Sequence, residues 1–251
     1  MTIEIMPGAE AWSADGGSLG VLCLHGFTGN PSTMRPIAEA AAEAGYSVEL
    51  PRLPGHGTTI EDMLSTGFRD WAGEAEAAYQ RLAARTDRIV VAGLSMGGAL
   101  TLHVGLAHPD VAGLICINPV TKPLDPEILE MARGMLAEGT TVIPGIGSDI
   151  ADPDAVESAY PGTPLQPLFS MIEDGIMPMT DRFGELSAPL LLMTSPQDHV
   201  VDPSNSDHLA ETAGGPVERV SLERSYHVAT LDFDRDLVIE RVLDFLRRRS
   251  A

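Results

Sequence analysis

The chain has 251 residues, of which 44% are hydrophobic and 21% are charged, a composition typical of a folded globular protein and not of a disordered one. Its 16 basic and 36 acidic residues give a formal net charge of −20, and Lys122 is the only lysine. Nucleic acids and anionic membranes bind clustered basic side chains, so neither is an expected partner.

Three further features of the sequence concern membrane insertion, cellular location and the cysteines. Stable membrane insertion is not expected, because the sequence has no apolar run near the roughly 20 residues of a membrane span. The N-terminus lacks a basic segment followed by an apolar one, so we expect a cytoplasmic location. Cys23 and Cys116 sit inside apolar runs and are interpreted as small core residues, not as a disulfide.

Apolar runs that resemble buried strands alternate along the chain with helical patterns. The expected helices cover residues 33–44, 70–85, 98–107 and 235–249. This alternation predicts an α/β fold with a mostly parallel sheet flanked by helices. The expected strands are Leu19–Leu24, Ser47–Leu50, Arg88–Leu94, Gly113–Ile117, Leu190–Thr194 and Val217–Leu222.

The alternation breaks between residues 119 and 189. That segment holds 10 of the 19 prolines and no clear strand, and from Val120 to Ser187 it has 3 basic and 12 acidic residues. The pattern predicts an insertion of short helices, residues 119–189, into a core made of residues 1–118 and 190–251. Insertions at strand ends of an α/β sheet are where ligands bind. An irregular part of the core itself is the alternative.

The motif G-x-S-x-G surrounds Ser95, between an expected strand and an expected helix. In this context the chain reverses sharply and exposes the serine hydroxyl, and glycines are needed where a Cβ would collide with backbone. Ser95 is therefore the candidate nucleophile. The amide of Met96, at the helix start, is a candidate oxyanion donor.

A nucleophilic serine needs a base and an acid, which follow it in this fold in the order Ser, Asp or Glu, His. Asp198 follows the expected strand Leu190–Thr194 and is the candidate acid, because its rival Asp202 immediately precedes Pro203 and is interpreted as a helix N-cap. Of seven histidines, His227 alone lies well beyond Asp198 and just after a strand, so it is the candidate base.

A second oxyanion donor is expected from the loop LHGFTGN, residues 24–30, where glycines flank Phe27. The amide of Phe27 is the candidate. His25 is interpreted as a support for this loop and His56, in the turn-rich residues 51–57, as a structural hydrogen-bonding group.

Other chemistries lack their motifs. The sequence has neither a G-x-G-x-x-G opening a helix after the first strand nor a phosphate-binding G-x-x-x-x-G-K-[ST] loop. Its histidines and cysteines are not spaced as zinc ligands, and serine at position 95 argues against reactions that need a carboxylate nucleophile. No metal or cofactor is expected.

Several stretches across nearly the whole chain resemble the bacterial carboxylesterase and monoacylglycerol lipase group of the α/β-hydrolases. They are HGFTGN (25–30), MRPIAEA (34–40), PRLPGHGT (51–58), EDM (61–63), GLSMGG (93–98), DHVV (198–201) and SYHVATLDFD (225–234).

The resemblance implies a catalytic triad of Ser95, Asp198 and His227, an oxyanion hole of the Phe27 and Met96 amides, and a small helical cap. It also implies that Glu157 and Ile146, in the segment IGSDIADPDAVESAY, help to recognise the glycerol end of a monoacylglycerol. A solvated residue on a cap helix is the alternative interpretation of Glu157.

The predicted function is hydrolysis of a neutral ester with a medium or long acyl chain, monoacylglycerol first, because the expected cap is apolar, rich in methionine and acidic. A carboxylesterase of short or medium-chain esters and a small-molecule receptor that retains the triad are alternatives. Cleavage of an amide or a carbon–carbon bond would use the same triad. The sequence leaves open both the oligomeric state and transient contact of the cap with a membrane or micelle.

Overall fold

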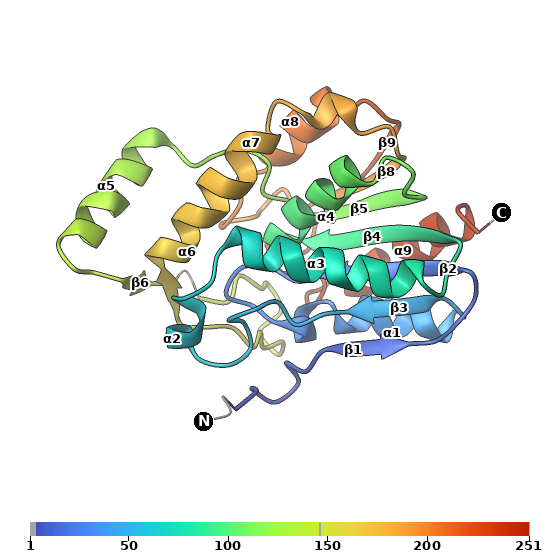
Figure 1. The fold of residues 1–251 in the computed structure, drawn as a ribbon, viewed down its shortest axis with the longest axis horizontal. Helices are drawn as coiled ribbons and strands as arrows, with labels where there is room; N and C mark the ends of the chain where they lie inside the picture. Colours follow the sequence, from blue (N-terminus) through green and yellow to red (C-terminus); the bar gives the residue numbers. More distant parts are fainter. Residues whose placement is uncertain (1–3, 146, 251) are drawn as a thin grey trace.

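A computed structural model describes residues 4–145 and 147–250. Its central feature is a seven-stranded sheet with the order β1-β3-β2-β4-β5-β8-β9 (Figure 1). Neighbouring strands are parallel except at the edge, where β1 is antiparallel to β3. The strands are β1 (Trp12–Ala14), β2 (Leu19–Leu24), β3 (Ser47–Leu50), β4 (Arg88–Leu94), β5 (Gly113–Ile117), β8 (Leu190–Thr194) and β9 (Val217–Ser221).

The predicted strands agree closely with this sheet. Five match in both bounds, and β9 ends one residue earlier than expected, at Ser221. The edge strand β1 was not predicted, because its three residues, Trp12–Ala14, are too few to show an alternating pattern.

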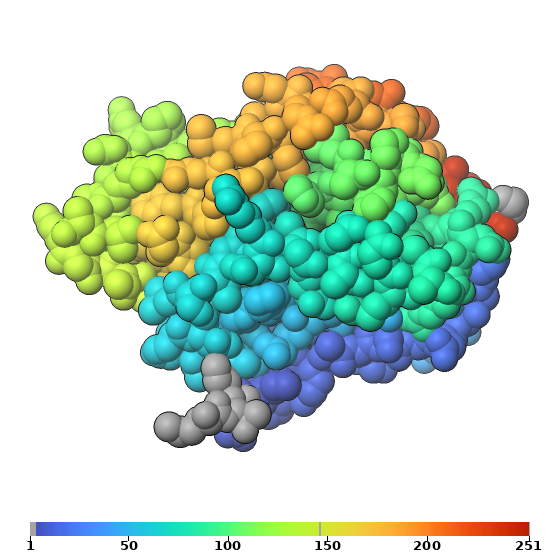
Figure 2. Space-filling view, viewed as in Figure 1, coloured from blue at the N-terminus to red at the C-terminus, as the bar shows by residue number. Residues whose placement is uncertain are grey.

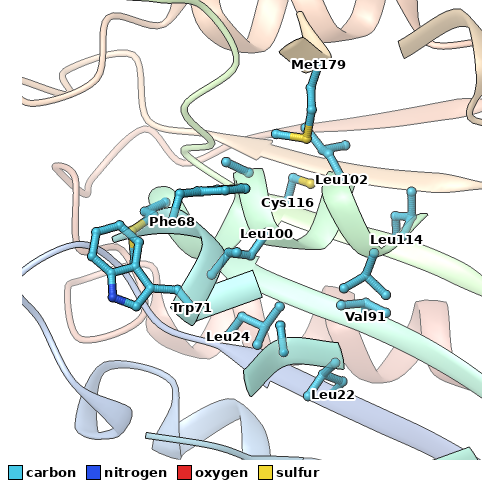
Figure 3. Close-up of a cluster of buried hydrophobic side chains, with 14 of the residues drawn as sticks. Leu22, Leu24, Phe68, Trp71, Val91, Leu100, Leu102, Leu114, Cys116 and Met179 are labelled. Carbon is cyan, nitrogen blue, oxygen red and sulfur yellow. The ribbon is translucent and has the colours of Figure 1, made fainter. Parts of the chain in front are cut away.

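Helices cover both faces of the sheet. Successive residues of a strand point to opposite faces, so each strand contributes side chains to both packed layers. On one face, Leu22 and Val91 pack with residues of α3 (Phe68–Ala83), α4 (Met96–Ala107) and α8 (Ser204–Thr212), as part of the cluster in Figure 3. On the other face, Val21 and Val90 pack with α1 (Arg35–Glu43) and α9 (Arg235–Arg247). The α/β prediction is confirmed, and Cys23 and Cys116 are buried and unpaired, one in each cluster.

Residues 119–189, the insertion, leave the sheet after β5 and return at β8. Figure 1 shows α5, α6 and β6 at the end of the molecule toward which the parallel strands β3 and β4 run. The predicted short helices are present, but two strands that the sequence did not indicate pair with each other. The elements of the insertion are α5 (Pro126–Ala137), β6 (Val142–Pro144), β7 (Gly162–Pro164), α6 (Leu165–Ser170), the π-helix η2 (Met171–Ile176), α7 (Met177–Met179) and η3 (Phe183–Glu185).

The two unpredicted strands are short, and β7 consists of Gly-Thr-Pro, in which two of the three residue types are depleted in strands. A small apolar cluster formed by Ala132, Leu165 and Phe169 joins α5 to α6. Helix α5 otherwise projects from the body of the molecule (Figure 2). Among the described helices, none is both long enough and apolar enough to cross a membrane.

Candidate active site

Ser95 occupies a strained turn between β4 and α4. Its φ of 59° and ψ of −119° lie outside the regions that L-residues normally adopt. The flanking glycines are required by backbone contacts: a Cβ at Gly93 would lie 2.0 Å from the carbonyl oxygen of Gly97, and one at Gly97 would lie 2.0 Å from that of Leu24. The predicted sharp turn is therefore present, with the glycines where it needs them.

The residues with a strained backbone lie together at the carboxyl ends of the parallel strands. In the described part of the chain, the non-glycine residues with positive φ are Thr28, Ser95 and Asn118, which follow the carboxyl ends of β2, β4 and β5. Such residues cost of order 1–3 kcal/mol each and persist where the surroundings impose them, commonly at functional sites. The strained positions therefore indicate that the candidate active site lies at the carboxyl ends of these strands.

The loop after β2 lies against Ser95. A Cβ placed on Gly26 would be 3.4 Å from the Cβ of Ser95, and Phe27 lines the same cavity as the serine. His25 supports this loop, as predicted: its Nδ1 donates to the carbonyl of Gly26 at 3.0 Å, and its Nε2 accepts from the amide of Leu53 at 3.1 Å.

Met96 begins α4, so its amide is one of the first-turn donors that have no acceptor within the helix. Its side chain is fully buried in the core and does not line the cavity. A backbone donor needs no exposed side chain, so the arrangement is compatible with an oxyanion role for the Met96 amide, which stays a prediction.

His56 packs beneath this loop, between the rings of His25 and Trp71. Its Nδ1 donates to the carbonyl of Pro54 at 3.0 Å. The predicted structural role is confirmed. Burial lowers the pKa of His56 from 6.5 to about 4 and lowers that of His25 well below 6.5.

These two shifts predict a loss of stability in mild acid. The unfolded chain takes up protons as pH falls below 6.5 while the folded chain does not, so stability falls through that range. For His56 alone the loss between pH 7 and pH 5 is about 2 kcal/mol. The variant His56→Asn keeps a donor for the Pro54 carbonyl but does not titrate. Urea unfolding at both pH values should show a shallower pH dependence for this variant, and equal dependences would contradict the assignment.

His227 and Asp198 form a buried pair. The Nδ1 of His227 donates to Oδ2 of Asp198 at 2.8 Å, and the side chain of Asp198 is only 1% exposed. The amides of Val200 and Val201 both donate to Oδ1 of Asp198 at 2.8 Å, so the carboxylate is held in place. Because a carboxylate can only accept here, Nδ1 of His227 carries the proton and Nε2 is left as an acceptor.

The rival residues have other partners. Asp202 accepts from the amide of Ser204, the first residue of α8, at 2.9 Å, although the N-cap of this helix is Pro203, one residue after the predicted one. The remaining histidines contact residues away from the Asp198 carboxylate: His103 packs on Phe68, His108 pairs with Glu76, His199 with Asp149 and His208 with Thr180.

Ser95 and His227 line one cavity of about 780 Å³, together with Phe27 and Glu157. Most of its remaining wall is apolar and comes from the insertion. These side chains are Val120, Leu124, Ile143, Leu168, Met171 and Ile172. The cavity therefore places a hydroxyl, an imidazole and a carboxylate beside a large apolar surface.

Glu157 lies in an irregular segment before β7, so its alternative interpretation as a residue on a solvated cap helix is wrong. A Cβ on Gly29 would be 3.6 Å from its Oε1, which places the carboxyl beside the loop of Phe27. Burial raises the pKa of Glu157, and the charge of Asp149 raises it further while His227 lowers it. Ile146, the other predicted cap contact, lies outside the described residues.

Sequence reasoning missed two polar residues of the site. Asn118 donates from Nδ2 to the carbonyl of His227 at 2.8 Å and accepts from the amide of Ser195 at 2.8 Å. Asp149 accepts from the amide of His227 at 3.1 Å. A polar residue directly after β5 was a usable signal for Asn118, whereas no local pattern distinguishes Asp149 among the acidic residues of the insertion.

Within residues 4–145 and 147–250, no three His, Cys, Asp or Glu side chains are grouped so that they could hold a metal ion.

Comparison with known proteins assigns the chain to a family. The model of the family described as serine aminopeptidase, S33, a hydrolase family, matches residues 19–234. The chain belongs to this family. Members of the S33 family are serine hydrolases, and the parallel sheet and serine turn described above are those of the α/β-hydrolase fold.

Several relatives of this S33 chain are lipolytic enzymes. It is 43% identical over 251 residues to a thermostable monoacylglycerol lipase of Bacillus sp. strain H-257, with 98% of both chains covered. It is 28% identical to a carboxylesterase of Bacillus subtilis strain 168, covering 93% of this chain and 94% of that one. A solved structure from work on the metagenome-derived lipolytic enzymes LipS and LipT superposes with a TM-score of 0.92 at 40% identity, covering 98% of this chain and all of that one.

Proposed function

We propose that the protein hydrolyses monoacylglycerols to fatty acid and glycerol through an acyl-enzyme on Ser95. The observation that carries the proposal is the buried 2.8 Å pair of His227 and Asp198, of which His227 lines one cavity with a serine held at positive φ. The 43% identity to an enzyme named for this substrate supports it.

The reaction has two steps. Nε2 of His227 takes the proton of Ser95 as the hydroxyl attacks the ester carbonyl, and Asp198 holds the ring and stabilises its charge. The glycerol oxygen leaves with the proton from His227. Water, deprotonated by the same Nε2, then attacks the acyl-enzyme and releases the fatty acid.

The negative oxygen of each tetrahedral intermediate needs donors that are already oriented. We assign this role to the amides of Phe27 and Met96, one from the loop after β2 and one from the start of α4. Loss of one such donor typically raises the barrier by about 2.7–4 kcal/mol. The contacts of His25 and Leu53 support this role by fixing the loop of Phe27.

Substrate choice follows from the cavity walls. The apolar side chains of the insertion would contact the acyl chain, and the carboxylate of Glu157 would accept hydrogen bonds from the free glycerol hydroxyls. Diacyl- and triacylglycerols have fewer free hydroxyls and more chains to place. Residues 119–189 thus act as a cap that selects the ester, while residues 1–118 and 190–251 carry the chemistry.

Replacing Glu157 by glutamine tests the recognition role. Hydrogen bonds to a charged acceptor are about 1 kcal/mol stronger than those to a neutral one, so KM for 1-monolauroylglycerol should rise about fivefold. Activity on p-nitrophenyl butyrate, which has no glycerol, should stay within about twofold. An equal change on both substrates would contradict the role. Asp154→Asn, an exposed acidic residue of the same segment, is the matched control.

The same variant has a predicted pH signature in stability. Because burial raises the pKa of Glu157 above 4.5, the unfolded chain loses this proton at lower pH than the folded chain does, and ionisation costs stability as pH rises past 4.5. Glu157→Gln should therefore gain stability relative to the parent between pH 4 and pH 7 in urea unfolding. A constant difference across this range would contradict the burial argument.

The outer surface of α5 suits contact with neutral lipid. Ile128, Met131 and Met135 lie three and four residues apart on one face and are 50%, 59% and 37% exposed. We propose that this face touches micelles or membranes of uncharged lipid transiently. The cytoplasmic location expected from the sequence stays a prediction.

A release assay separates this function from its alternatives. The expected order of activity is 1-monolauroylglycerol above short p-nitrophenyl esters, with diacyl- and triacylglycerols far lower. A carboxylesterase would prefer the short esters, a peptidase would cleave aminoacyl p-nitroanilides, and a receptor would turn over once or not at all. Absence of multiple turnovers on monolauroylglycerol would overturn the proposal.

A further inference from the structure

Asp149, a residue of the insertion, is hydrogen-bonded to two histidine-containing segments of the core. Its Oδ2 accepts from the amides of His227 at 3.1 Å and His199 at 3.0 Å, and its Oδ1 pairs with Nδ1 of His199 at 2.8 Å. The residue is 8% exposed. Its own carbonyl accepts from the amide of Val228 at 3.1 Å. One insertion residue thus accepts hydrogen bonds from two consecutive backbone amides, those of His227 and Val228.

A second carboxylate makes the reciprocal connection. Asp232, in the core loop that carries His227, accepts from the insertion amides of Ala151 at 2.8 Å and Asp152 at 3.0 Å. It also accepts from the amide of Tyr226 at 2.8 Å, the residue before His227. We call Asp149 and Asp232 the carboxylate clamp. Asp149 of the insertion binds amides of the core loop, and Asp232 of the core loop binds amides of the insertion.

We propose that Asp149 is a positioning residue that sets the placement of His227 from the insertion. The inference rests on the proposed role of His227 as the base. It assigns a function to Asp149, a residue of the insertion that lines the same cavity as Ser95 and His227.

The geometry supports a positioning role because His227 is held at three separate points. Asp198 fixes the ring at Nδ1, Asn118 fixes the carbonyl, and Asp149 fixes the amide. Only the last of these comes from within the insertion. Removing a buried acceptor leaves its donor unsatisfied, so the loop would shift until the amide finds water or another partner.

The two functions of the Asp149 carboxylate can be separated. The imidazole of His199 is 57% exposed, and exposed ion pairs contribute little. The two backbone amides, in contrast, are bound through one oxygen, which the side-chain oxygen of asparagine can replace. Acceptance of the amides, not the negative charge, is therefore the property that positions His227.

The experiment measures kcat and KM for p-nitrophenyl butyrate and 1-monolauroylglycerol in four variants. A displacement near 1 Å can cost about 10²-fold in rate, so Asp149→Ala should lower kcat about 10²-fold on both substrates with KM nearly unchanged. Asp149→Asn and His199→Ala should stay within about threefold of the parent. Asp154→Ala, an exposed neighbour in the same segment, should match the parent.

The results that would overturn the inference are distinct. They are an Asp149→Ala kcat within threefold of the parent, an Asp149→Asn variant as impaired as Asp149→Ala, or a defect confined to KM of the long-chain substrate. The last pattern would mean that Asp149 only shapes the cap. Activity that survives in His227→Ala would reject the proposed base itself, whereas an inactive His227→Ala with a fully active Asp149→Ala rejects only the positioning role.

A measurement on the parent protein covers the case in which Asp149→Ala does not fold. Amide hydrogen exchange followed by NMR should show the amides of His227, His199, Ala151 and Asp152 protected together, because one clamp holds them. Fast exchange at His227 and His199 beside slow exchange in β8 would overturn the inference without any variant.

Discussion

Ser95→Ala should lower kcat for 1-monolauroylglycerol by on the order of 10⁶-fold, since loss of the nucleophile removes the covalent route entirely. The variant should stay folded, because the alanine Cβ occupies the place of the serine Cβ already accommodated by the turn. His227→Ala should be about as inactive, because the two residues act as one unit. The activity of both variants is measured by titrating the fatty acid that they release.

A control serine makes this result specific. Ser65 is exposed beyond the end of α2 (Ile60–Met63), and Ser65→Ala should leave kcat unchanged. If Ser95→Ala keeps more than about a hundredth of the parent activity, then another group performs the attack and the acyl-enzyme account is wrong. If His227→Ala retains such activity, then His227 is not the base that takes the proton of Ser95.

Gly97→Ala is expected to destabilise the protein by about 3 kcal/mol or more, although glycine to alanine within a helix usually stabilises by about 1 kcal/mol. The new Cβ would lie 2.0 Å from the carbonyl oxygen of Leu24 and 2.7 Å from that of His25. Both contacts are with backbone, which cannot rotate away. The displaced segment leads directly into the loop of Phe27, so activity should fall as well.

Gly73→Ala is the matched control. Gly73 lies inside α3, is exposed, and would place its Cβ with nothing within 4 Å. This substitution should raise the free energy of unfolding by about 1 kcal/mol. Urea unfolding of both variants checks the pair, and a Gly97→Ala variant as stable as the parent would contradict the close approach of α4 to β2.

The sequence predicts the centre of the sheet well because its strands there are buried on both faces and consist mainly of apolar residues. Leu19–Leu24 and Leu190–Thr194 are such runs, and their bounds agree with β2 and β8. Where strands are short and lack this composition, as in β1 and β7, local pattern carries no signal. Such strands form because they pair with a neighbouring strand, and not because their residues have a high β-propensity.

The candidate site divides in the same way. Ser95 and the Asp198–His227 pair were predictable, because the chemistry requires particular residue types at strand ends in a fixed order. The surroundings of Glu157 were not, since no repeat or motif indicates that this segment is irregular.

Asp149 and Asp232 act through backbone amides far away in sequence, as in the 78 positions that separate Asp149 from His227. An amide donor is present at almost every residue, so only the folded arrangement shows which ones they bind.

The acyl-enzyme itself is the most direct test of the account. Rapid acid quenching during turnover of 1-monolauroylglycerol, followed by peptide mass spectrometry, should find one lauroyl group on the peptide that contains Ser95, and none in Ser95→Ala. Steady release of fatty acid with no acyl group on the protein, or with the group on a different residue, would contradict the account.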